Sequence, residues 1–265
     1  MINKLPNNIS EFSNFVEHPF CIFEKKNFLP NYTYKLLRSN FPDEKIFPGY
    51  HQQGKKIFFN NKHKEFENFI KGNIWEDFYR YFNNKDFVLS LIRLIHPQLE
   101  LIENRKNFKN FKFNKKSSNN FLNRLLRKLF KLINHQTIRV GFEFSIIKKD
   151  CFIPPHCDTE NKLLSLMIYF PPEKKLDLSK EYLNLGTNFY DKKSDAKKNL
   201  DIWQSKYLDN ENLKNFYDNY KVFYSSKFEE NKLVGFIKND KSWHDVSVFN
   251  QDLLRKSLNI NLFLE

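Results

Sequence analysis

A histidine and an aspartate stand two residues apart, directly before the most apolar run of the chain. His156 and Asp158 flank Cys157, and the apolar residues 163–170 follow. Because residues i and i+2 of an extended chain point to the same side, the imidazole and the carboxylate face one way and the thiol faces the other. An imidazole beside a carboxylate supplies two ligands of a metal site. The rest of the sequence decides whether a third ligand exists.

A third candidate ligand, His244, opens a later β-rich stretch, and Arg255 and Ser257 follow on one face of the last predicted strand. Two histidines and a carboxylate on adjacent strands form a facial triad, which favours non-haem Fe(II) and leaves coordination positions open. A structural zinc site would use four protein ligands, usually with cysteine, and the cysteines here have no suitable spacing. An inward arginine needs an anionic partner, and a carboxylate suits its guanidinium fork. Ser257 is placed to donate to the same carboxylate.

Strands must position these side chains, and the carboxy-terminal half is rich in them. Short β-forming runs are separated by turn residues. The predicted strands are 138–147, 163–170, 221–224, 233–237, 243–249 and 257–264. A polar, largely helical stretch, 176–219, interrupts them and is interpreted as an insertion. Short strands with one long excursion indicate a jelly-roll barrel over residues 136–265.

The amino-terminal part, residues 1–135, is predicted to be mostly helical support for this barrel. A short strand at 19–23 precedes a helix that ends at Pro42. Apolar residues recur at helical spacing over 63–82, and a further helix from Phe87 is expected to end at Pro97. A chain of 265 residues can bury all of this in one domain.

The chain carries a formal net charge of +13, which invites a nucleic-acid or anionic-surface function. It also has 30 Phe, only 6 Gly and many Asn and Lys, as expected from a genome rich in A and T. Much of the lysine excess is therefore interpreted as solvated surface, and a nucleic-acid partner is not expected.

Residues 104–131 form a basic segment with ten Lys or Arg and no acidic residue. Its first part, up to Asn120, is predicted to be an exposed loop, and 121–133 to be a basic amphipathic helix. Such a helix either packs on the fold with its charges in water or contacts a membrane surface or an anionic polymer. The sequence leaves both interpretations open.

A cytoplasmic location is expected. The first residues, Met1 to Ser10, lack the apolar core of a signal peptide, and no segment has the 18 apolar residues of a membrane span. Cys21, Cys151 and Cys157 are too few and too irregularly spaced for a disulfide framework.

The ordered set of these candidate residues resembles the iron(II)- and 2-oxoglutarate-dependent oxygenases, particularly their prolyl-hydroxylase-like branch. The strand 164–170, the turn 185–187 and the opening residues 19–20 and 27–30 share in the resemblance. It implies a mainly β fold, a double-stranded β-helix (jelly roll, cupin-like) packed by N-terminal helices. It also implies roles for six residues: Fe(II) is held by His156, Asp158 and His244, the distal carboxylate of 2-oxoglutarate is bound by Arg255 and Ser257, and Tyr169 lines the co-substrate pocket.

The activity implied by the resemblance is hydroxylation of a substrate C–H bond with O2, giving succinate and CO2 as co-products. The substrate would be a small metabolite, a sugar- or lipid-linked compound or a protein side chain, and the basic residues raise the option that it is anionic. Asp158, where a halogenase has a small residue, argues against halogenation. Many prolyl hydroxylases have a tyrosine where this chain has 146–149, Ile-Ile-Lys-Lys, so prolyl substrates are not implied. The alternative is a non-catalytic jelly roll that binds an anionic polymer or a membrane surface through its basic segment.

Overall fold

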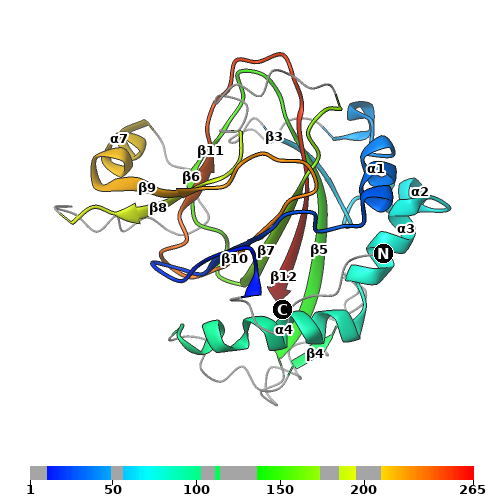
Figure 1. The fold of residues 1–265 in the computed structure, drawn as a ribbon, viewed down its shortest axis with the longest axis horizontal. Helices are drawn as coiled ribbons and strands as arrows, with labels where there is room; N and C mark the ends of the chain where they lie inside the picture. The colour runs from blue at the N-terminus through cyan, green and yellow to red at the C-terminus, as the bar shows by residue number, and fades with distance from the viewer. Residues whose placement is uncertain (1–10, 49–55, 103–110, 114–135, 174–184, 195–209) are drawn as a thin grey trace.

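The computed structural model describes residues 11–48, 56–102, 111–113, 136–173, 185–194 and 210–265. Two β-sheets lie face to face, with helices on the outer side of the larger one (Figure 1). The large sheet has the strand order β1-β2-β10-β7-β12-β5-β3, and β4 pairs with β5 beside this row. Its strands are β1 (Asn14–Val16), β2 (Ile22–Lys25), β3 (Lys56–Asn60), β4 (Phe111–Phe113), β5 (Gln136–Ile147), β7 (Lys162–Tyr169), β10 (Leu233–Ile237) and β12 (Arg255–Leu264).

The small sheet has four strands in the order β6-β11-β8-β9. They are β6 (Ile153–His156), β8 (Asn188–Lys192), β9 (Tyr220–Ser225) and β11 (His244–Val246). Among the described strands from β5 onward, consecutive ones along the chain mostly lie in different sheets. This arrangement is the double-stranded β-helix that the sequence predicts.

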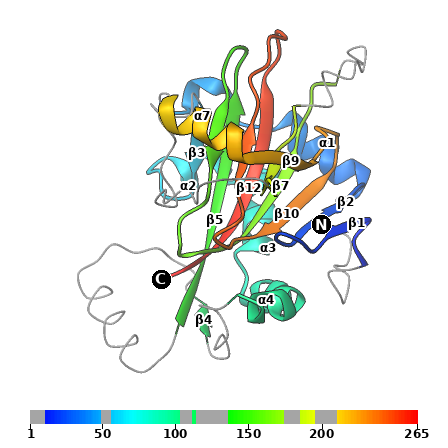
Figure 2. The ribbon, with the colours of Figure 1, turned by 90° about the vertical axis from the view of Figure 1, so that its left-hand side faces the viewer.

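Helices α1 (Asn31–Ser39), α2 (Phe66–Ile70) and α3 (Ile74–Phe82) cover the outer face of the large sheet. Helix α4 (Lys85–Glu100) crosses below one end of the sheet, and α7 (Asn210–Asn219) packs on the small sheet (Figure 2). A 3-10 helix, η2, spans Glu44–Ile46. None of the described helices is long and apolar enough to span a bilayer.

Alternation along the central strands gives the large sheet two unlike faces. On β12, Leu258, Ile260 and Leu262 join the core between the sheet and the helices. The residues between them, Asn259 and Asn261, point into the space between the sheets, where they line a cavity. The period of two that defines a strand therefore separates the core of the protein from its site.

Three sequence predictions about element boundaries are wrong. Strand β8 lies inside the stretch 176–219 that was expected to be an insertion, and it pairs with β11 and β9 at the centre of the small sheet. Phe111–Phe113, expected in an exposed loop, pairs in parallel with β5 as β4. Strand β3, which the sequence did not predict, lies in the part expected to be mostly helical, 1–135, and pairs with β5.

Proline and glycine act differently in the two predicted helices. Helix α4 continues through Pro97 to Glu100. Leu99, its last residue but one, is buried, while Pro97 and Arg93 are exposed, so water can reach the carbonyl that Pro97 leaves unpaired. The helix expected over 63–82 is instead broken at Gly72, which has φ of 73°. The side chain of Asn73 then caps α3 by accepting a hydrogen bond from the Trp75 amide at 2.8 Å.

Apart from β4, the basic segment 104–131 lies outside the described residues, as does the amphipathic helix expected over 121–133. The expected helical character of the stretch before β9 is found in α7. The domain prediction of a single unit over 1–265 stays a prediction.

Candidate metal centre and anion pocket

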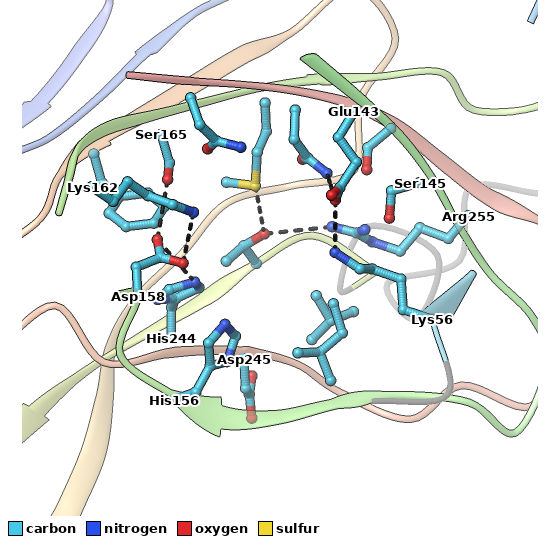
Figure 3. Close-up of a pocket in the computed structure, with 18 residues that line it drawn as sticks. Lys56, Glu143, Ser145, His156, Asp158, Lys162, Ser165, His244, Asp245 and Arg255 are labelled. Atoms are coloured by element: carbon cyan, nitrogen blue, oxygen red, sulfur yellow. Dashed lines mark hydrogen bonds and ion pairs between the residues drawn. The ribbon is translucent and has the colours of Figure 1, made fainter. Parts of the chain in front are cut away.

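His156, Asp158 and His244 come together at one end of a cavity between the two sheets (Figure 3). β6 carries His156 at its last position, β11 carries His244 at its first, and the two residues are direct cross-strand neighbours. One ligand atom from each of the three residues lies within 4.8 Å of the other two. Ligand atoms at this spacing can converge on one small cation after a modest adjustment of the side chains.

Both imidazoles are held by backbone carbonyls. His156 Nδ1 lies 2.9 Å from the carbonyl oxygen of Pro154, and His244 Nδ1 lies 2.9 Å from that of Ser242. A carbonyl only accepts, so Nδ1 must donate and Nε2 is the unprotonated nitrogen in the neutral ring. Metal-binding histidines are oriented in this way in known sites.

Asp158 is oriented by two donors. Lys162 Nζ donates to Oδ1 at 2.7 Å, and Ser165 Oγ donates to Oδ2 at 3.1 Å. Oδ2 also faces His244 Nε2 at 4.0 Å. The carboxylate can therefore turn one oxygen to a cation while Lys162 retains the other, which fits a monodentate ligand.

Burial and charge prepare these three groups for a cation. Burial, and secondarily the charge of His244, lowers the pKa of His156 to about 3, and burial also lowers that of His244. Burial alone would raise the pKa of Asp158, but Lys162 and the two histidines outweigh it and hold that pKa well below its usual range. Two neutral imidazoles and one carboxylate are the protonation states that bind a metal.

Arg255 lies at the other end of the same cavity and is 2% exposed (Figure 3). Its guanidinium donates to the carbonyl oxygens of Leu185 and Gly186 and to Thr187 Oγ1. None of the described carboxylates forms an ion pair with it. Burial lowers the pKa of Arg255, and the Tyr169 hydroxyl acts in the opposite direction. A buried guanidinium without a carboxylate is costly, so this end of the cavity is suited to an anion.

The two other predicted co-substrate residues have different positions. Ser257 is buried, lines the cavity and is two residues from Arg255 on β12, as predicted. Tyr169 is not among the residues that line the cavity. Its ring faces the Arg255 guanidinium at 5.2 Å, and its hydroxyl bonds Thr187 and Ser226 at 3.0 and 2.8 Å. Tyr169 therefore supports Arg255, and its expected place in the pocket lining is not observed.

Several polar residues that sequence reasoning missed also line the cavity. They are Lys56, Glu143, Ser145, Lys162, Ser165, Thr187, Asp245, Asn259 and Asn261. The alternation that pairs Arg255 with Ser257 extends to Asn259 and Asn261, so the sequence could have predicted that these two asparagines face the cavity. Asp245 accepts bonds from Asn188 at 2.8 Å and from Tyr190 at 2.7 Å, and thus ties β11 to β8 beside His244.

Three solved structures to which this chain is similar have the following likeness to it. A prolyl-4-hydroxylase from Pseudomonas putida matches with a TM-score of 0.50 at 9% identity, over 92% of this chain and 93% of that one. A Trichoplax adhaerens prolyl hydroxylase, solved with a peptide fragment of the oxygen degradation domain of hypoxia inducible factor, gives 0.48 at 10% identity, over 91% and 83%. HygX of Streptomyces hygroscopicus, solved with nickel, 2-oxoglutarate and hygromycin B, gives 0.45 at 8%, over 91% and 82%.

At such low identity these likenesses concern the fold alone, and the first of them places this chain in the double-stranded β-helix fold of a prolyl hydroxylase. No protein-family model matches the sequence, and no curated protein is significantly similar to it. The predicted fold class is confirmed. What the site does must be argued from its own residues.

Proposed function

We propose that the protein is an Fe(II)- and 2-oxoglutarate-dependent dioxygenase that hydroxylates a C–H bond of its substrate. The observation that carries the proposal is one cavity with a His-Asp-His cluster at one end and a buried arginine at the other. A metal ion and a dianion between them would satisfy both ends. The His-Asp-His cluster alone, or the buried arginine alone, would indicate this class of enzyme less specifically.

His156, Asp158 and His244 would hold the iron. They supply three ligand atoms from one side, which is the arrangement that non-haem Fe(II) oxygenases use and which leaves other positions open. The three cysteines are free, and none of them belongs to the cluster. Free thiols are also in keeping with the cytoplasmic location that we propose.

Arg255 would bind the distal carboxylate of 2-oxoglutarate. Its remaining donor capacity points into the cavity, and Ser257 lies beside it on the same face of β12. The guanidinium already has carbonyl partners that fix its plane, so little side-chain freedom is lost when an anion arrives. The rings of Tyr169 and Phe228 lie 5.2 and 5.6 Å from the guanidinium carbon and help to shield it from water.

When bound, iron(II) and 2-oxoglutarate together supply oxidative hydroxylation by O2, with succinate and CO2 as co-products. The chain orients and shields that chemistry. The carbonyls of Pro154 and Ser242 fix the imidazoles, and Lys162 and Ser165 fix the carboxylate. Apolar side chains on both sheets restrict water near the centre: Ile153, Met167, Phe236 and Val246.

The proposal is tested by adding Fe(II) and then 2-oxoglutarate to the purified protein without oxygen and recording the visible spectrum. A chelated iron–oxoacid pair gives a charge-transfer band, which we expect in the wild type and not in His244→Ala. His96→Ala removes a histidine from the surface of α4, away from the cavity, and should leave the band unchanged. Absence of the band in folded wild-type protein would overturn the proposal.

A further inference from the structure

The inner face of the large sheet continues past the proposed iron and co-substrate sites as a polar wall. This wall is formed by Glu143 and Ser145 on β5 and by Asn259 and Asn261 on β12. Asn259 is paired with Glu143 across the two strands, and Asn261 with Ser165 on β7. Since Ser165 contacts Asp158, the wall reaches the level of the metal ligands.

The two lysines that line the cavity are each paired with a carboxylate. Lys56 Nζ bonds Glu143 Oε1 at 2.9 Å, and Lys162 Nζ bonds Asp158 Oδ1 at 2.7 Å. Burial would raise the pKa of Glu143, but Lys56 outweighs it and keeps the carboxylate ionised. Among the described residues that line the cavity, only Arg255 is a cation without a carboxylate, and the co-substrate would use it. No unpaired cation is left among them for an acidic substrate, and the carboxyl group of Asp245 is already hydrogen-bonded by Asn188 and Tyr190.

Hydrogen-bonding capacity, in contrast, is left over. Among the described residues, the two hydrogen bonds to Glu143 both end on Oε1, from Lys56 and from Asn259 at 3.3 Å, which leaves Oε2 as an acceptor at the cavity. The Asn261 amide and the Ser145 hydroxyl have no hydrogen-bond partner among the described residues, although both residues are buried. Because these three residues line the cavity, a ligand or water inside it can satisfy their free hydrogen-bonding groups.

We propose that the substrate is a neutral, hydroxyl-rich small molecule that is hydrogen-bonded by Glu143 Oε2, Ser145 and Asn261. This inference rests on the proposed function and names the substrate class of the same site. Hydroxyl groups both donate and accept, which matches an acceptor, an amide and a hydroxyl on one wall. An apolar prolyl ring would leave these groups unpaired in a desolvated cavity, and an acidic substrate would find no spare cation.

Pairs of probes that differ only in charge provide the test. Glucose, trehalose and myo-inositol are compared with glucose 6-phosphate, trehalose 6-phosphate and an inositol phosphate, and a proline-containing peptide amide is added. Binding to the protein loaded with Fe(II) and 2-oxoglutarate without oxygen is measured by saturation-transfer NMR, and the visible band is recorded in the same samples. We expect at least one neutral polyol to bind, and to bind better than its phosphorylated counterpart.

Variants of the wall complete the design. Asn261→Leu and Glu143→Gln should weaken binding of that polyol about tenfold, the loss of one or two hydrogen bonds in a buried site. Asn68→Ala, an exposed asparagine on α2, should not change it.

Preferred binding of the phosphorylated probes or of the peptide would overturn the inference, and so would failure of every neutral polyol to bind. In each case a normal visible band shows that the proposed function stands. A missing band in the wild type would instead remove the proposed function, and the inference with it.

Discussion

The two faces of the large sheet are built from the same strands but have opposite compositions. On the outer face Phe142, Phe144 and Leu258 pack with the helices in a continuous apolar core. On the inner face their immediate neighbours in sequence, Glu143 and Asn259, are polar and line the cavity. Strand geometry is common to both faces, so it cannot account for the difference.

The difference indicates that folding stability depends mainly on the outer face and ligand binding on the inner face. Aromatic rings on the outer face meet at close range, as Phe144 and Trp75 do with ring centroids 4.7 Å apart. Such packing supplies the free energy of folding. The inner face instead holds ion pairs and unpaired hydrogen-bonding groups, which contribute little to stability or reduce it. We therefore expect outer-face substitutions to lower stability and inner-face substitutions to affect binding.

The largest expected effect is from truncation on the outer face. Phe144 is fully buried among aromatic side chains, so Phe144→Ala should lower the free energy of unfolding by about 3–5 kcal/mol. Urea denaturation followed by far-UV circular dichroism measures this. The visible iron–oxoacid band per folded molecule should be unchanged. A loss below about 1 kcal/mol would mean that the outer face is not the main source of stability.

On the inner face, Arg255→Met should produce the reverse pattern. Loss of a charged hydrogen-bonding partner should weaken 2-oxoglutarate binding about tenfold to a hundredfold. Stability without ligands should be equal or higher because an uncompensated buried charge is removed. Titration of the visible band with 2-oxoglutarate and urea denaturation measure the two effects.

The matched control is Arg80→Met, which removes an exposed arginine paired with Glu76 on α3. This variant should bind 2-oxoglutarate like the wild type. If Arg255→Met and Arg80→Met both bound 2-oxoglutarate like the wild type, the anion pocket would lie elsewhere.

The same contrast explains what the sequence could predict. Strands β5, β7, β10 and β12 were predicted because runs of β-forming residues bounded by turn residues are a local signal, and the cluster of His156, Asp158 and His244 follows from their positions at strand ends. Strand β8 was missed because its five residues are flanked by polar sequence, and its identity as a strand depends on pairing with β11 and β9.

Residues that enter the site from other parts of the chain could not be predicted either. Lys56 comes from the edge strand β3 and reaches Glu143, 87 residues away in sequence. No local pattern marks such a pair. Glu143 itself stands between two phenylalanines that face outward, so the sequence indicates that its side chain faces inward. Its function, however, depends on its partner Lys56.

Glu143→Gln should produce a smaller, pH-dependent effect. Because Lys56 holds the pKa of Glu143 below its usual value, the folded protein binds a proton here less readily than the unfolded chain. The stabilisation by the Lys56–Glu143 pair is therefore fully present above the pKa of glutamate in the unfolded chain, about 4.3. It is lost as the pH falls through the lower pKa of Glu143 in the folded protein. We expect the variant to lose about 1 kcal/mol at pH 7 and progressively less below pH 4 or so.

Urea denaturation at several pH values checks this. Glu67→Gln replaces an exposed glutamate on α2 and should show no such dependence. A difference that grew as the pH fell would contradict the assignment of Glu143 as the ionised partner of Lys56.

The smallest expected change is that of Asn261→Leu. Together with Ile260→Asn at the adjacent residue of β12, it tests the comparison between the two faces most directly. Asn261 faces the cavity and has no hydrogen-bond partner among the described residues, so Asn261→Leu breaks no bond and buries apolar surface. Its free energy of unfolding should stay within about 1 kcal/mol of the wild type or rise. Ile260 is 1% exposed on the outer face, and Ile260→Asn should lower that free energy by several kcal/mol, since it buries an amide among apolar groups. Equal losses in the two variants would show that both faces serve folding, and the polar wall would then need no ligand to explain it.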